Sequence, residues 1–119
     1  MKRITLVLVI VAVAAVFTVA GVATGATTLS LTAPATGALT FSKKALAGKA
    51  GLVTINLRNL GPLPHDISLK GPGVNAHGKI VGKGLTSTVR ATLKKGRYTF
   101  YCSVPGHEAA GMKGTLVVS

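Results

Sequence analysis

Cysteine, acidic and aromatic residues are scarce in this chain of 119 residues. There is one cysteine, no tryptophan, and only two acidic residues against 14 lysines and arginines. A single cysteine excludes a disulfide within the chain, and exported domains generally use their cysteines in pairs. Cys102 is therefore a free thiol, half of an intermolecular bridge, or a metal ligand. The chain length is that of one domain.

The excess of positive charge limits the classes of partner. Removing residues 1–26 takes away Lys2 and Arg3, so 14 − 2 = 12 basic residues remain against two acidic ones. They are scattered along the chain, and there is no arginine-rich run, helix-turn-helix pattern or aromatic stacking motif, so nucleic-acid binding is not expected. A solvated basic surface favours acidic partners, either a protein or an anionic membrane.

The N-terminus has the pattern of a targeting segment. A basic head (residues 1–3) precedes an apolar run of 17 residues (4–20) and a group of small residues (23–26). This pattern predicts a secretory signal peptide over residues 1–26, cut after Ala26. The alternative is a retained membrane anchor, because 17 residues is near the lower limit for a spanning helix. Either case places a domain of residues 27–119 outside the cytoplasm, in the periplasm or at the cell surface; the second tethers it through residues 4–20.

The rest of the chain is typical of a β-sandwich. Glycine and proline recur every few residues, and short segments between them alternate apolar and polar side chains, with no sustained helical period. We therefore predict an all-β fold, a single antiparallel β-sandwich. A glycine-rich stretch, residues 71–84, is expected to be the longest loop. The predicted strands centre on residues 29–31, 39–41, 53–58, 67–69, 89–93, 98–102 and 116–118.

Two rare sulfur residues lie close together near the C-terminus. Cys102 ends a predicted strand, and His107 and Met112 follow at the spacing C-x4-H-x4-M, before the next strand begins near Gly114. Thiolate and thioether ligands favour Cu(I), whereas imidazole suits copper in both oxidation states. One tight loop could thus supply three of the four ligands of a redox-active copper ion.

The fourth ligand must be another histidine, for which there are two candidates. His65 follows Gly61-Pro62-Leu63-Pro64, a rigid turn that would hold its ring at one end of the sandwich. His77 lies in the glycine-rich stretch, where a surface histidine with no metal is the ordinary expectation. We favour His65, and His77 is the alternative.

Residues 59–66 and 101–114 together resemble the cupredoxins, the blue-copper family that includes plastocyanin, amicyanin, azurin and the auracyanins. The resemblance implies a Greek-key sandwich and one type 1 copper ion held by His65, Cys102, His107 and Met112. The loop length is similar to that of the auracyanins; plastocyanin has a shorter spacing between cysteine and histidine. By analogy Asp66, where the family often has asparagine, would tie its loop to Ser103.

The resemblance also implies what such a protein does. It would carry one electron at a time between a donor and an acceptor protein through the Cu(I)/Cu(II) couple, and would not be an enzyme. Its partners would dock on an apolar patch around His107, and the lysines would steer an acidic surface toward it. We expect a monomer. The predicted patch consists of Leu63, Pro64, Pro105, Ala109 and Ala110.

Other copper and metal functions are less compatible with the sequence. Copper nitrite reductases and multicopper oxidases have histidines beside the cysteine that lead to a second copper centre, whereas Tyr101 and Ser103 flank Cys102 here. The whole chain has only three histidines. Zinc is disfavoured because a thioether is a poor ligand for it. Extracytoplasmic copper storage or delivery is the main alternative, although one usable methionine is few for an exchangeable site.

Overall fold

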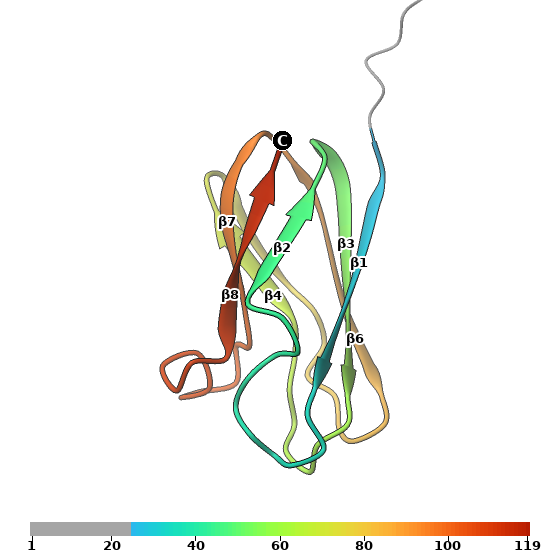
Figure 1. The fold of residues 1–119 in the computed structure, drawn as a ribbon, viewed down its shortest axis with the longest axis vertical. Coiled ribbons are helices and arrows are strands. Elements are labelled where there is room, and N and C mark those ends of the chain that lie inside the picture. Colours follow the sequence, from blue (N-terminus) through green and yellow to red (C-terminus); the bar gives the residue numbers. More distant parts are fainter. Residues whose placement is uncertain (1–24) are drawn as a thin grey trace, which may run out of the picture.

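The structure, a computed structural model, describes residues 25–119 and consists of two β-sheets packed face to face (Figure 1). One sheet has the order β1-β3-β6 and the other β2-β8-β7-β4-β5. The predicted all-β sandwich is confirmed. The strands are β1 Thr27–Ala33, β2 Ala45–Gly48, β3 Gly51–Asn59, β4 Ser68–Gly71, β5 Val74–His77, β6 Thr86–Leu93, β7 Gly96–Tyr101 and β8 Lys113–Val118. No helix in residues 25–119 is long and apolar enough to cross a membrane.

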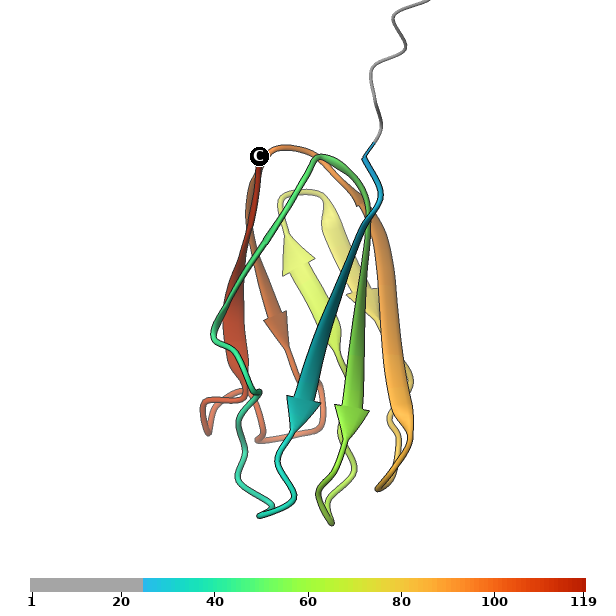
Figure 2. The same ribbon diagram turned by 45° about the vertical axis from the view of Figure 1, so that its right-hand side comes forward.

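The core lies between the two sheets, which face each other in Figure 2. On β3 every second side chain is buried, and Val53, Ile55 and Leu57 are at most 1% exposed. They belong to one apolar cluster with residues of the facing sheet, including Phe100 and Leu116. Burial of each such side chain contributes roughly 1.5–3 kcal/mol, and the alternation along each strand therefore fixes which face of the sheet turns inward.

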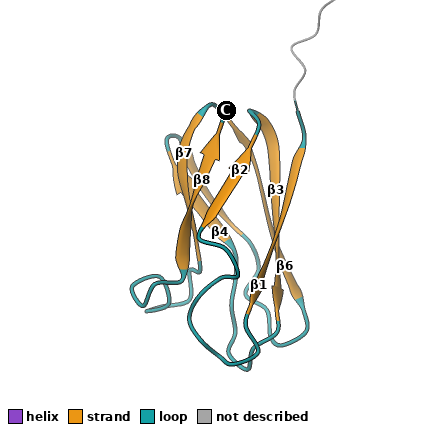
Figure 3. Ribbon diagram, viewed as in Figure 1, coloured by secondary structure: helices purple, strands orange, loops and turns teal. Residues whose placement is uncertain are grey.

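Two strand pairings differ in direction from the antiparallel arrangement that the sequence suggested. β1 pairs with β3 and β2 pairs with β8 in parallel, while the other pairs are antiparallel (Figure 3). Alternation of apolar and polar residues is the same for either direction. The sequence pattern therefore shows that a strand is half buried, and it does not show the direction of its neighbour.

Two predicted segments also differ locally from the structure. Residues 39–41 are not a strand; Phe41 reaches the core from a loop, with its ring centroid 5.7 Å from that of Phe100. The short strand β2 forms a few residues later instead. Within the expected loop of residues 71–84, Val74–His77 form β5, which pairs with β4. Backbone pairing with an existing sheet edge overrides the weak local strand preference there.

The loops that carry the candidate metal ligands gather at one end of the sandwich. The C-terminus and the entry of residue 25 lie at the opposite end (Figure 1). The predicted signal or anchor segment, residues 1–26, falls almost entirely outside the described residues, and its cleavage remains a prediction.

Candidate metal centre

The loop between β7 and β8 brings three of the predicted ligands together. The Cys102 N–H donates to the carbonyl of Met112 (3.1 Å), and the Met112 N–H donates to the carbonyl of His107 (3.0 Å). Gly106, directly before His107, has φ +84°, a conformation that favours glycine. A tight turn thus folds the loop back, so that its first, middle and last residues are adjacent.

His65 is held by a second set of loops. Its N–H and carbonyl form an isolated bridge with Val81 (3.1 and 2.8 Å). The fully buried Asn59 joins the same loops: its Nδ2 donates to the carbonyls of Leu63 (2.8 Å) and Val81 (2.9 Å), and its Oδ1 accepts from the Gly61 N–H (3.0 Å). This role of Asn59 is not predictable from the sequence, because a polar side chain that bonds only to backbone leaves no signal in residue spacing.

Two histidine nitrogens and the cysteine sulfur form a small triangle. His65 Nδ1 and His107 Nδ1 are 3.2 Å apart, and the Cys102 Sγ is 3.8 Å from the first and 3.5 Å from the second. A trigonal metal with bonds of about 2.0 Å to nitrogen and about 2.3 Å to sulfur needs edges of about 3.5 Å and about 3.7 Å. The observed edges match these to within a few tenths of an ångström, so this donor set fits one copper ion.

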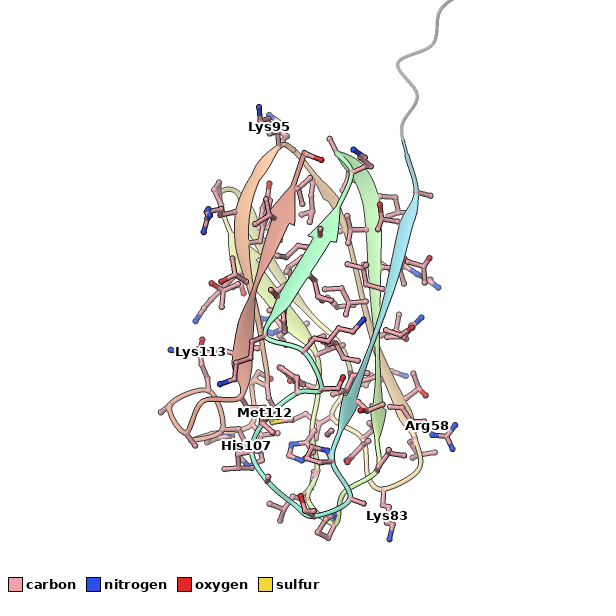
Figure 4. The ribbon with its side chains drawn as sticks, viewed as in Figure 1. Arg58, Lys83, Lys95, His107, Met112 and Lys113 are labelled. Atoms are coloured by element: carbon pink, nitrogen blue, oxygen red, sulfur yellow. The ribbon has the colours of Figure 1, made fainter. Side chains whose placement is uncertain are left out.

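Met112 lies close to the residues of this triangle, whereas His77 lies away from them. The Met112 side chain is fully buried at the same end of the molecule, next to His107 (Figure 4). His77 lies on β5 with an exposed side chain, outside the cluster of His65, Cys102 and His107. The alternative ligand His77 is therefore not brought to the site, whereas all four favoured residues are brought to one end of the sandwich.

The candidate ligands differ in their access to solvent. His65, Cys102 and Met112 are fully buried, while His107 is partly exposed. His65 Nε2 is buried with no hydrogen-bond partner in residues 25–119, which leaves Nδ1, facing the sulfur and His107, as the nitrogen with polar neighbours. The histidine at the surface is therefore the one nearest to any molecule that approaches from outside.

The surroundings favour a neutral imidazole and a protonated thiol when no metal is bound. Burial is the main cause that lowers the pKa of His65; the nearby His107 lowers it further, and Asp66 opposes both. Burial raises the pKa of the Cys102 thiol, although the backbone N–H groups of Asp66 and Val104 oppose this rise. Because a metal binds the thiolate, its binding must release the thiol proton.

The predicted tie between Asp66 and Ser103 is present. The Asp66 Oδ1 accepts a hydrogen bond of 2.6 Å from the Ser103 N–H, and its Oδ2 accepts a short one from the Ser103 hydroxyl. Asp66 is 1% exposed. The residue after His65 thus holds the residue after Cys102, which fixes the two loops relative to each other.

The only other acidic residue of the chain is neutralised by a lysine. Glu108, next to His107, forms an ion pair of 2.6 Å with Lys70, whose Nζ also lies 4.4 Å from the centroid of the Tyr101 ring. Such a partly exposed pair contributes at most about 1 kcal/mol to stability. Its larger effect is that no unpaired acidic side chain remains on the described surface.

Comparison with known proteins gives consistent matches. The profile of the family described as "Copper binding proteins, plastocyanin/azurin family" matches residues 28–119. An azurin from Pseudomonas fluorescens biotype C is 47% identical over 47 residues, a match that spans 36% of this chain and 36% of that azurin. The chain thus covers about a third of the length of that curated relative.

Solved auracyanin structures match over almost their whole length. The dithionite-reduced auracyanin from Roseiflexus castenholzii has a TM-score of 0.68 and 25% identity, covering 80% of this chain and 99% of its own. Auracyanin A from Chloroflexus aurantiacus, described as a "blue" copper protein, has a TM-score of 0.69 and 25% identity, covering 80% and 100%.

Proposed function

Since this chain belongs to the plastocyanin/azurin family of copper-binding proteins, we propose that it is an electron carrier that uses one type 1 copper ion. The proposed ligands are His65, Cys102, His107 and Met112. The observation that carries the proposal is the triangle of two imidazole nitrogens and one thiol sulfur, with edges of 3.2 to 3.8 Å, beside a buried methionine.

The donor set suits a metal that changes charge by one unit. When bound, copper supplies a one-electron couple, and this mixture of imidazole, thiolate and thioether is acceptable to both of its oxidation states. The protein's part is to keep the ligands in place. The bonds from Asn59 to the loop carbonyls and from Ser103 to Asp66 hold the ligand loops. A site that moves little when its charge changes favours fast electron transfer.

We propose His107 as the point of electron entry and exit, because it is the partly exposed member of the ligand set. Exposed apolar side chains of the predicted patch lie in the two ligand-bearing loops, so a partner could exclude water there. The cations elsewhere on the surface would attract an acidic partner and raise its encounter rate. The patch residues are Leu63, Pro64, Pro105, Ala109 and Ala110, all exposed.

We also propose that the protein works outside the cytoplasm, in the periplasm or at the cell surface. The support is the sequence of residues 1–26, with its basic head, apolar run and small residues. The segment would be either removed or retained as a tether through residues 4–20.

Voltammetry of the copper-loaded protein tests the electron-carrier proposal. We expect a reversible one-electron wave and rapid electron exchange, and we expect the Cys102→Ser variant to lose both. Copper storage or delivery predicts a different result: rapid loss of copper to a Cu(I) chelator, with slow or irreversible electron transfer. That second result would replace the proposed function with the alternative.

A further inference from the structure

His77 is outside the candidate metal centre, yet hydrogen bonds connect it to the centre. Its Nδ1 lies 3.0 Å from the hydroxyl oxygen of Ser68, a side chain that is fully buried. The chain has three histidines, and the other two are proposed ligands. His77 is therefore the one histidine of the chain outside the proposed ligand set.

The hydrogen bonds in this network all run toward one carboxylate. The Ser68 hydroxyl donates to the Asp66 Oδ2 (3.2 Å), and since a hydroxyl has one hydrogen, the Nδ1 of His77 is the donor to Ser68. Asp66 also accepts from the N–H and the hydroxyl of Ser103. Three donors thus point at one buried carboxyl group, whose two oxygens are the acceptors in all of these bonds.

The network ends directly beside two proposed ligands. Asp66 follows His65 in the chain, and Ser103 follows Cys102. Ser68 is also the register partner of both His77 on β5 and Tyr101 on β7, so the sheet itself aligns the surface histidine with the strand that leads to Cys102. Although the His77 side chain is exposed, a change of its charge thus reaches a buried, oriented set of groups through Ser68.

We propose that His77 is a positioning residue for the copper centre, which orients Asp66 through Ser68 and makes the reduction potential depend on pH. Protonation of His77 strengthens its hydrogen bond to Ser68 and adds a positive charge, which favours the reduced and less positive state of the centre. The potential therefore rises on acidification. The inference rests on the proposed function, since a reduction potential requires copper at Cys102.

Few other groups near His77 can produce the same effect. The charged or titratable side chains on the strands around β5 and in the loops that adjoin them include one acid, which is already part of the network. Lysine, arginine and tyrosine side chains ordinarily change charge well above the range in which an imidazole does. These side chains are Lys70 on β4 and Arg90 on β6, then Arg97, Tyr98 and Tyr101 on the next strand, β7, and Asp66 and Lys79 in the adjoining loops.

The first test compares reduction potentials of the full-length protein from about pH 8 to about pH 5. We expect the wild-type potential to rise as the pH falls. The His77→Gln variant should lose the part of this rise in reduction potential that comes from protonation of His77. Any part that comes from the ligand histidines would remain. Lys79→Gln removes an exposed cation two residues from His77. It should shift the reduction potential by the same amount at every pH and leave the slope of potential against pH unchanged. Superimposable pH curves for the wild type and His77→Gln would overturn the proposal.

A second test needs no copper. In the metal-free protein, NMR should show the Ser103 backbone amide shifting with the same midpoint as the His77 ring, recorded separately from His65 and His107. Ser68→Ala should leave the His77 titration and abolish the Ser103 response; if that variant does not fold, His77→Gln should abolish the response. An unresponsive Ser103 in the wild type refutes the network. A responsive Ser103 in a protein that fails to bind copper refutes only the proposed function.

Discussion

The backbone N–H of Cys102 donates a hydrogen bond of 3.1 Å to the carbonyl of Met112, so the two ends of the ligand loop are directly paired. Two proposed ligands that are ten positions apart in sequence therefore have their backbones in contact. This pairing, with the turn at Gly106 between them, makes the geometry of three ligands depend on the conformation of one loop.

The turn before His107 should be sensitive to loss of glycine. Gly106 has φ +84°, and a Cβ there would meet no atom within 4 Å, so Gly106→Ala costs backbone strain alone, roughly 1 kcal/mol of unfolding free energy. Gly82 is equally open and lacks the positive φ, so Gly82→Ala is the matched control and should be neutral or slightly stabilising. Urea denaturation measures both. If both variants change the unfolding free energy equally, the positive φ at residue 106 imposes no strain on alanine.

Asn59 should be a large contributor to the stability of the His65 loop. Asn59→Ala removes three hydrogen bonds and leaves buried backbone groups without partners, at a cost of roughly 3 kcal/mol. Asn75→Ala, on the exposed side of β5, should change the unfolding free energy by less than about 0.5 kcal/mol. The comparison is made by denaturant titration of the metal-free protein. A small effect at Asn59 would mean that the loops hold His65 without it.

The stability of the metal-free protein should be greatest between about pH 6.5 and about pH 9. The pKa of His65 is lowered from 6.5 in the folded protein, so the unfolded chain binds the extra proton and stability falls as the pH drops below 6.5. The pKa of Cys102 is raised from 9.0, so the unfolded chain loses its proton first and stability falls as the pH rises above 9.0. Melting temperatures measured from below pH 6.5 to above pH 9 test the prediction. A Cys102→Ser variant should lose the alkaline decline, and its persistence there would assign the decline to other groups.

Met112 should affect the copper centre more than it affects the fold. Met112→Leu nearly conserves the volume of a buried side chain and should cost less than about 1.5 kcal/mol. Loss of an axial thioether should nevertheless change the reduction potential of the copper-loaded protein, because the axial ligand tunes that potential. Voltammetry and thermal unfolding of one variant separate the two effects. An unchanged potential would remove Met112 from the proposed ligand set.

Much of this site was predictable because its residues carry their chemistry in their type and spacing. Cys102, His107 and Met112 lie on one loop, and the proline-flanked turn distinguished His65 from His77. The tie between Asp66 and Ser103 followed from the resemblance to the cupredoxins. The role of Asn59 and the link from His77 to Asp66 were not predictable, because both depend on which loops and strands become neighbours in space.

The fold was predictable to the level of strand positions and less so in its pairing. Alternation identified β3, β6 and β7, whose buried faces are long and regular. Residues 39–41 had a strand-like pattern, yet the burial of Phe41 is achieved from a loop. Strand direction and the formation of β5 are decided by contacts between distant segments, which local patterns do not contain.

The visible spectrum of residues 27–119 with one equivalent of Cu(II), before and after ascorbate, tests whether this chain forms a redox-active copper–thiolate centre. We expect an intense charge-transfer band in the orange-red region from a Cu(II)–thiolate bond, which bleaches on reduction and is absent from Cys102→Ser. A colourless protein, or one that retains only Cu(I), would contradict the electron-carrier account.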